Sequence, residues 1–279
     1  MSEQREYVLG QSADAARRLE LQDAHLGDIS ERLLDELNLK ANDRVVELGC
    51  GPGNFSRRII RRLGAGGVLV GVDASEGLMA HARNALANVG PARFEPVVAN
   101  ITELGAWLTN ADVVVGRAVL HHVPLVEAML GRLAAAVKPG TRLGFLEPDF
   151  RSPLGNVARL SATNRPELEP LLAWAKAIND LYQLSRLSPA IGATLGRTLE
   201  LAGCANVRAT WTEFPSDALV IENIVMIYDE IRSRLEALGI MTGAQIERQQ
   251  RLLKALPIGS LPTAWGMFRV TCQAAGSIP

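Results

Sequence analysis

The sequence has few cysteines and contains no long apolar run. Only three cysteines occur among its 279 residues, and Cys50, Cys204 and Cys272 are widely spaced and form no CxxC pair. This pattern predicts a reducing compartment, the cytoplasm, and no structural zinc. No stretch of about 18 apolar residues is present, so we expect no membrane-spanning helix. The first six residues are too charged for a signal peptide.

Neither sign of charge dominates the sequence, and aromatic side chains are scarce. Lys and Arg number 29 against 30 for Asp and Glu, a net charge of −1, and aromatic residues make up 5%. A general nucleic-acid-binding protein usually carries a basic excess, and a single-strand binder needs aromatic stacking platforms. The composition therefore argues against a nucleic-acid partner. No pattern in the sequence predicts a metal site.

Short apolar runs alternate with helix-like segments through the first half of the chain. Strands alternating with helices imply βαβ units and a parallel, doubly wound α/β sheet. The predicted strands are residues 45–48, 68–72, 94–98, 112–115 and 143–146, and the predicted helices between them are 53–63, 76–88 and 125–137.

Helical patterns dominate both ends of the chain. Leu26 to Leu37 recur at helical spacing, and Leu19 and Leu21 suggest an earlier, separate helix. After a loop at 151–166, helices are expected at 167–183, 189–202, 217–238 and 243–256, and strands at 207–214 and 268–272. Thr242 and Gln245 fit a capping box that opens the last helix. We therefore expect an N-terminal helical part (1–40), a Rossmann-like core (41–150) and a helical cap that contributes the final strands (151–279).

The strongest local signal is a glycine-rich segment between the first predicted strand and the first predicted helix. It reads Glu47-Leu-Gly-Cys-Gly-Pro-Gly53, and glycines there allow a tight turn and a close ligand. A dinucleotide fingerprint would place its third glycine at residue 54, which is Asn54. The sulfonium and ammonium groups of S-adenosylmethionine suit the acidic Glu47 better than a pyrophosphate does. Asp73, at the end of the second strand, suits the ribose hydroxyls of either ligand.

Five motifs together resemble the class I S-adenosylmethionine-dependent methyltransferases, in particular the ubiquinone/menaquinone-biosynthesis branch. Members of that family fold as a Rossmann-like, mostly parallel sheet with an antiparallel last strand. The motifs cover roughly residues 5–150 and are Tyr7-Val-Leu-Gly with Arg17-Arg18-Leu and Gln22, Glu47 to Asn54, Val70-Gly-Val-Asp73-Ala-Ser, Arg117-Ala-Val-Leu-His121-His122-Val-Pro, and Val137-Lys-Pro-Gly140 with Glu147-Pro148.

The resemblance implies S-adenosylmethionine as the cofactor and S-adenosylhomocysteine as the product, and it implies which residues bind the cofactor. Glu47 and the glycines would line the methionine and ribose part, and Asp73 would bind the ribose hydroxyls. Cys50, inside the loop, most simply fills space. The implied cofactor set is Tyr7, Arg18, Gln22, Glu47, Gly49, Cys50, Gly51, Gly53, Asp73, Ala74, Met79, Asn100, Ile101 and Arg117.

The remaining members of this set would contact the two ends of the cofactor. Ala74 and Met79 would lie against the adenine, with Asn100-Ile101 beside it. The backbone of Arg117 would contact the methionine end. Tyr7, Arg18 or Gln22 would close over the methionine carboxylate.

Candidate bases follow the fourth and fifth strands. His121, His122 and Asp149 are the candidates for a catalytic role, with Glu147 beside them. A histidine has an ordinary pKa of about 6.5, which suits a base at neutral pH. A structural role is the alternative for each of the four, and an acceptor that is already nucleophilic needs no base.

The cap carries no motif, but its helices are apolar. This composition indicates a small, largely apolar acceptor, such as an aromatic, isoprenoid, indole-like or polyketide compound. A nicotinamide-dependent oxidoreductase and a non-catalytic protein with this fold remain alternative interpretations. The two C-terminal helices pack on each other or form a homodimer interface, and the sequence leaves both open.

Overall fold

The chain forms two compact units in this computed structural model, which describes residues 13–151, 168–214, 217–258 and 265–275. The sheet unit comprises Leu26–Pro148, Ala190–Thr212 and Met267–Pro279. The helical unit comprises Met1–His25, Asp149–Pro189 and Glu213–Gly266.

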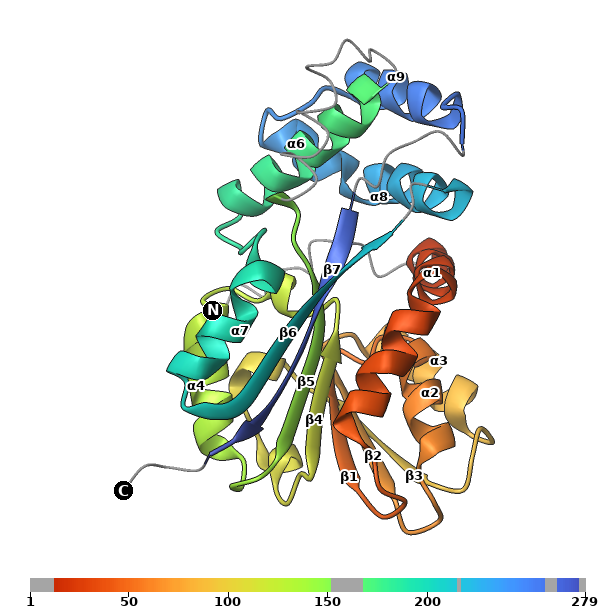
Figure 1. The fold of residues 1–279 in the computed structure, drawn as a ribbon. Coiled ribbons are helices and arrows are strands. Elements are labelled where there is room, and N and C mark those ends of the chain that lie inside the picture. The colour runs from red at the N-terminus through yellow and green to blue at the C-terminus, as the bar shows by residue number, and fades with distance from the viewer. Residues whose placement is uncertain (1–12, 152–167, 215–216, 259–264, 276–279) are drawn as a thin grey trace, which may run out of the picture. The chain divides into compact units, whose positions relative to one another are not determined.

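A seven-stranded sheet forms the centre of the sheet unit, in the order β3-β2-β1-β4-β5-β7-β6 (Figure 1). The pairs β3–β2, β2–β1, β1–β4 and β4–β5 are all parallel. The strands are β1 (Arg44–Leu48), β2 (Val68–Asp73), β3 (Arg93–Val98), β4 (Val113–Arg117), β5 (Arg142–Pro148), β6 (Cys204–Phe214) and β7 (Trp265–Ala274).

The last strand runs against its neighbour. β7 pairs with β5 in antiparallel register, with Leu143 opposite Cys272. The predicted doubly wound α/β sheet, mostly parallel with an antiparallel last strand, is therefore confirmed.

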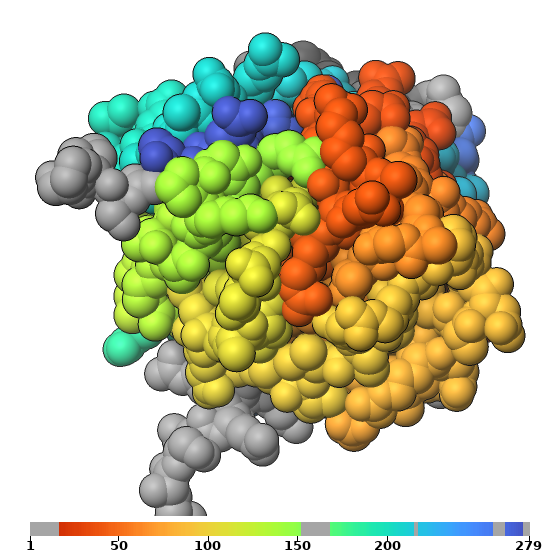
Figure 2. Space-filling view, turned by 90° about the horizontal axis from the view of Figure 1, so that it is seen from below, coloured from red at the N-terminus to blue at the C-terminus, as the bar shows by residue number. Residues whose placement is uncertain are grey.

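Helices cover both faces of the sheet (Figure 1). α4 and α7 lie on one face, and α2, α3 and the second half of α1 lie on the other. Figure 2 looks at this unit from the end where the parallel strands begin, and the red to green atoms form one continuous surface there. The helices are α1 (Ala13–Leu37), α2 (Asn54–Arg62), α3 (Glu76–Leu86), α4 (Val126–Ala136) and α7 (Ile191–Leu201), with short 3₁₀ turns η1 (Ile101–Glu103), η2 (Ala106–Leu108) and η3 (Leu120–His122).

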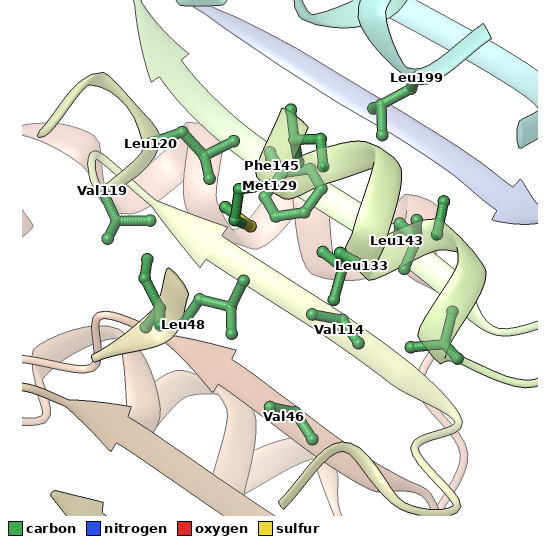
Figure 3. Close-up of a cluster of buried hydrophobic side chains, with 14 of the residues drawn as sticks. Val46, Leu48, Val114, Val119, Leu120, Met129, Leu133, Leu143, Phe145 and Leu199 are labelled. Atoms are coloured by element: carbon green, nitrogen blue, oxygen red, sulfur yellow. The ribbon is translucent and has the colours of Figure 1, made fainter. Parts of the chain in front are cut away.

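Alternating strand residues and one stripe of α4 build the main core. Val46 and Val114 from the strands and Leu133 from α4 are completely buried, and Figure 3 shows such side chains converging. Burying a side chain of this size stabilises the fold by about 1.5–3 kcal/mol. This packing holds the carboxyl ends of β1, β2 and β4 in fixed positions.

The predicted separate helix around Leu19 and Leu21 is wrong. A single helix, α1, runs from Ala13 to Leu37. Its end is held by Arg142, whose Nη1 donates to the carbonyl oxygens of Leu37 (2.8 Å) and Asn38 (2.6 Å). These bonds satisfy carbonyl groups that have no partner within a helix.

The helical unit has a core of its own. α6 (Glu169–Leu184), α8 (Ala218–Ala237) and α9 (Gly243–Lys254) bury Tyr182 and Tyr228 among aliphatic side chains. The capping box predicted for α9 is confirmed, because Thr242 and Gln245 bond each other reciprocally. Nowhere in the described part of the chain does a helix have the length and apolarity needed to cross a membrane.

Candidate functional site

The glycine-rich segment forms a tight loop between β1 and α2. The backbone N–H groups of Gly49 and Cys50 both donate to the carbonyl oxygen of Val72, at 2.8 and 3.1 Å. Gly49 has a φ of +67°, and a Cβ there would overlap the Cγ2 of Val119. Both the left-handed backbone and the close approach therefore require glycine at this position.

Two carboxylates border the loop. Glu47 is 2% exposed and accepts a 2.5 Å hydrogen bond from the Ser56 hydroxyl. Asp73 accepts from the backbone N–H groups of Gly51 and Ser75, both at 2.9 Å. Burial raises the pKa of Asp73, although these N–H groups oppose the shift. The sequence therefore folds so that acidic side chains stand at the carboxyl ends of β1 and β2.

Cys50 is buried inside this loop. Burial raises the pKa of its thiol, and the carboxylates of Glu47 and Asp73 raise it further. The thiol consequently stays protonated at neutral pH and is a poor nucleophile.

The residues predicted to lie near an adenine differ in their exposure. Ala74 is exposed, Ile101 is 8% exposed, and Met79 is fully buried in α3 and presents no surface to a ligand. The side-chain oxygen of Asn100 accepts from the N–H and hydroxyl of Thr102, at 3.0 and 2.9 Å. The oxygen that the adenine amino group would need is thus already bonded at the start of η1.

Arg117, at the end of β4, brings a positive charge to the glycine loop. Its Nη1 donates to the Ser30 hydroxyl at 3.1 Å, and its guanidinium lies 4.9 Å from the ring centre of Phe55. Phe55 follows the loop directly in the first turn of α2. Sequence reasoning assigned only a backbone contact to Arg117, because nothing in a sequence shows where a long side chain ends.

The turn after β4 is held by a buried carboxylate for which the sequence left both a base and a structural role open. Glu147, at the end of β5, has no exposed surface. Its oxygens accept from the backbone N–H groups of Val119 (2.8 Å), Leu120 (2.9 Å) and His121 (3.3 Å). Figure 3 shows Val119 and Leu120 in this turn.

The same carboxylate holds the ring of His121. The Nδ1 of His121 lies 2.7 Å from Glu147, and the ring centre of His121 lies 3.9 Å from that of His122. His121 is 4% exposed, whereas His122 is half-buried. Of the two histidines predicted as bases, His121 is the one whose ring is oriented by a carboxylate.

Three of the residues predicted to act at the site belong to the helical unit. A further one, Tyr7, lies outside the described residues. Arg18 is 1% exposed, its Nε pairs with Glu230 at 2.9 Å, and its Nη1 donates to Gln22 at 3.3 Å. Asp149 accepts from the backbone N–H of Arg151 at 3.0 Å. The structure therefore gathers Glu47, the glycines, Asp73, Arg117 and His121–His122 on the sheet unit, and it places Arg18, Gln22 and Asp149 in the helical unit.

The arrangement on the sheet unit suits a cationic ligand with vicinal hydroxyls. The buried Glu47 and the half-buried Asp73 offer hydrogen-bond acceptors and negative charge beside the glycine loop, which a sulfonium group prefers and a pyrophosphate does not. A match to the methyltransferase domain family covers residues 45–140. The trans-aconitate 2-methyltransferase of Rhizobium leguminosarum is 31% identical over 192 residues, 68% of this chain and 69% of the relative. The chain belongs to the class I S-adenosylmethionine-dependent methyltransferases.

Other members of the family agree with this assignment. The trans-aconitate 2-methyltransferase of Variovorax paradoxus is 35% identical over 146 residues, 51% of this chain. The match spans about half the length of that relative, 53%. The solved structure of phosphoethanolamine N-methyltransferase 2 from Haemonchus contortus with S-adenosylhomocysteine has a TM-score of 0.55 at 13% identity, over 96% of this chain and 58% of that one, and shares the fold.

The cofactor of this methyltransferase fold is S-adenosylmethionine, and the carboxylates of Glu47 and Asp73 beside the glycine loop fit it. The resemblance to the ubiquinone/menaquinone branch in particular is not reproduced among these relatives, which are named for trans-aconitate. Among the described residues, no group of three or more His, Cys, Asp or Glu side chains is arranged to hold a metal ion.

Proposed function

We propose that the protein transfers the methyl group of S-adenosylmethionine to a small acceptor at the carboxyl edge of the sheet. The observation that carries this proposal is the pair of carboxylates, the buried Glu47 and the half-buried Asp73, beside a loop whose Gly49 admits no side chain. In a doubly wound sheet, ligands bind outside the carboxyl ends of the strands.

The proposed cofactor contacts follow the strand ends. Asp73 and Glu47 accept from the ribose hydroxyls and the ammonium group, and the Arg117 guanidinium beside Phe55 faces the methionine carboxylate. The roles that the resemblance implies for Tyr7, Arg18 and Gln22 at this end stay predictions, and Arg18 is already paired with Glu230. Ala74 and Ile101 would lie against the adenine, with Gly51, Gly53 and Cys50 completing the loop. Met79 is fully buried and the Asn100 oxygen already accepts from Thr102, so neither is proposed as a direct contact.

The protein's own task in this reaction is alignment. S-adenosylmethionine supplies an already activated methyl group, which leaves a sulfonium by in-line displacement. The chain must then bind the acceptor in line with that methyl and exclude water. Positioning of this kind can contribute about 7–11 kcal/mol to the lowering of a barrier.

His121 is the proposed base. Its Nδ1 is bound to Glu147 at 2.7 Å, so a proton from the acceptor would be taken at the other ring nitrogen, Nε2. This role requires an acceptor whose reacting atom carries a proton at neutral pH, such as a hydroxyl. The cap's apolar helices favour an acceptor with an apolar body, in agreement with the acceptor class that the sequence indicates.

A carboxylate acceptor is the second candidate, because the curated relatives are named for trans-aconitate. A carboxylate is ionised at neutral pH and needs no base. The two candidates therefore differ in whether turnover depends on His121.

One assay tests both candidates. The full chain is incubated with S-adenosylmethionine and either apolar hydroxyl compounds or trans-aconitate, and release of S-adenosylhomocysteine is measured. For a hydroxyl acceptor, His121→Ala is expected to lower kcat by about 10²- to 10⁴-fold without changing cofactor affinity. The control, His81→Ala, changes an exposed histidine on α3 and is expected to have no effect. Turnover of trans-aconitate alone, at equal rates in both variants, would reject the apolar acceptor and the base.

A further inference from the structure

We infer that Glu147 is a positioning residue that fixes the proton of His121 on Nδ1 and holds the turn between this ring and the glycine loop. The catalytic part of this inference rests on the proposed role of His121 as a base. Its structural basis is independent of any acceptor.

Every neighbour that contacts the Glu147 carboxylate can be a donor. Oε1 accepts from the N–H groups of Val119 and Leu120, and Oε2 faces the N–H and Nδ1 of His121. A backbone N–H cannot accept a proton. Because both oxygens of a carboxylate only accept, all four bonds are satisfied together only when Nδ1 of His121 carries a hydrogen. In the neutral ring the lone pair then lies on Nε2, the nitrogen that can act as a base.

The backbone of this turn is one that its residues would not adopt alone. Ala118 has a φ of +52°, in the left-handed region that a residue with a Cβ rarely enters. Its N–H donates to the carbonyl oxygen of Leu146 at 2.8 Å, and the next three N–H groups converge on Glu147. A single carboxylate thus stabilises a strained turn, as is common at functional sites.

The turn also borders the cofactor loop. The Val119 side chain occupies the space in which a Cβ of Gly49 would lie. The backbone of α7 reaches the other side of the same strand end, because Gly192 packs against the carbonyl oxygens of Glu147 and Pro148. A shift of Glu147 would therefore be transmitted both to the His121 ring and to the glycine loop.

The substitution Glu147→Gln tests the inference, because it keeps the shape and replaces one oxygen by an NH₂ donor. If the NH₂ faced Val119 and Leu120, it would oppose two N–H donors. If it faces His121, it opposes one N–H and can donate to Nδ1, provided that the ring proton moves to Nε2. We expect the second arrangement, and with it a loss of the base.

Nitrogen-15 NMR of the full chain reads the ring proton directly. Among the four histidines, His121 is assigned by the signal that His121→Ala removes. We expect the wild-type His121 ring to carry its hydrogen on Nδ1, and Glu147→Gln to move it to Nε2 and to lower kcat at least tenfold, with cofactor affinity changed less. The control, Glu95→Gln, alters a half-exposed glutamate on β3 and should change neither.

A wild-type ring with its hydrogen on Nε2 would overturn the inference, even if Glu147→Gln failed to fold. An unchanged ring signal and kcat in a folded Glu147→Gln protein would also overturn it. Absence of methyl transfer to any acceptor, together with the expected ring signals, would instead reject the proposed function and leave the positioning role in place.

Discussion

Gly49 shows how one residue can be required for two separate reasons. Its φ is +67°, and its α-carbon faces the Val119 side chain. Alanine at this position would cost about 1–2 kcal/mol for the left-handed backbone and about 1–3 kcal/mol for the overlap. We expect Gly49→Ala to lower the free energy of unfolding by the sum and to abolish S-adenosylmethionine binding.

A matched control separates the two costs. Gly140 also has a positive φ, +82°, but a Cβ there would meet nothing within 4 Å. Gly140→Ala should therefore lose only the backbone contribution in urea unfolding and keep full cofactor affinity in calorimetry. Equal losses in the two variants would show that Val119 does not pack against Gly49 as described.

The burial of Asp73 predicts how cofactor affinity depends on pH. Burial raises its pKa above the ordinary value of about 3.9. Only the ionised carboxylate accepts hydrogen bonds on both oxygens, so cofactor affinity should fall as the pH is lowered through this raised pKa. The fall should begin at a higher pH than an ordinary aspartate would give.

Calorimetric titrations between pH 8 and pH 4 measure this dependence. The substitution Asp73→Asn should remove the pH dependence. It should also weaken cofactor binding by about 1.5–3 kcal/mol, roughly a tenfold to hundredfold loss of affinity. Asp112→Asn, a change at a half-buried aspartate bonded to the Arg44 N–H and to Lys138, should leave binding intact. Wild-type affinity in Asp73→Asn would contradict its assignment to the cofactor.

Residue types and spacing identified the glycine loop, Asp73 and the histidines, because each lies within a short motif. They did not identify how Glu147 holds His121 and the turn after β4, since those partners lie 26 to 28 residues apart in sequence. Nor did they reveal that Arg18 is 1% exposed and paired with Glu230. Long-range side-chain contacts leave no periodic pattern in a sequence.

The packing of helix α7 predicts how a glycine substitution in it changes the stability of the protein. A Cβ at Gly192, in its first turn, would lie 2.6 Å from the carbonyl oxygens of both Glu147 and Pro148. Backbone atoms cannot move aside cheaply, so Gly192→Ala should lower the free energy of unfolding by about 1–3 kcal/mol or more.

Gly196 provides the comparison within the same helix. A Cβ there would meet the Ala209 side chain at 3.4 Å, an ordinary contact. Gly196→Ala should therefore be neutral or stabilise the protein by up to about 1 kcal/mol, because alanine favours a helix. Thermal and urea unfolding of both variants measures the difference, and a stable Gly192→Ala protein would contradict the close packing of α7 on β5.

Strands and helices were predictable because each buries one repeating set of apolar side chains. The alternation from β1 to β5, the capping box of α9 and the helices of the cap all followed from local pattern. The exception was α1, where the spacing of Leu19 and Leu21 suggested a separate helix. One helix, α1, carries both leucine patterns, and its residues up to His25 belong to the helical unit and those from Leu26 to the sheet unit.

At the scale of the whole molecule, the division into two units bears on function. The cofactor motifs and His121 lie in the sheet unit, whereas most of the cap belongs to the helical unit, which has a separate apolar core. The family match covers residues 45–140 only. Cofactor use could therefore be inferred from motifs, but the acceptor depends on a part of the chain that carries none.

The most direct test of the account is calorimetric titration of the full chain with S-adenosylmethionine, S-adenosylhomocysteine, NAD and NADP. We expect the first two to bind at one site per chain and the two nucleotides not to bind, because the acidic Glu47 that borders the glycine loop suits a sulfonium and not a pyrophosphate. Binding of NAD or NADP, with none of either sulfur compound, would contradict the assignment of the loop and of the protein's activity.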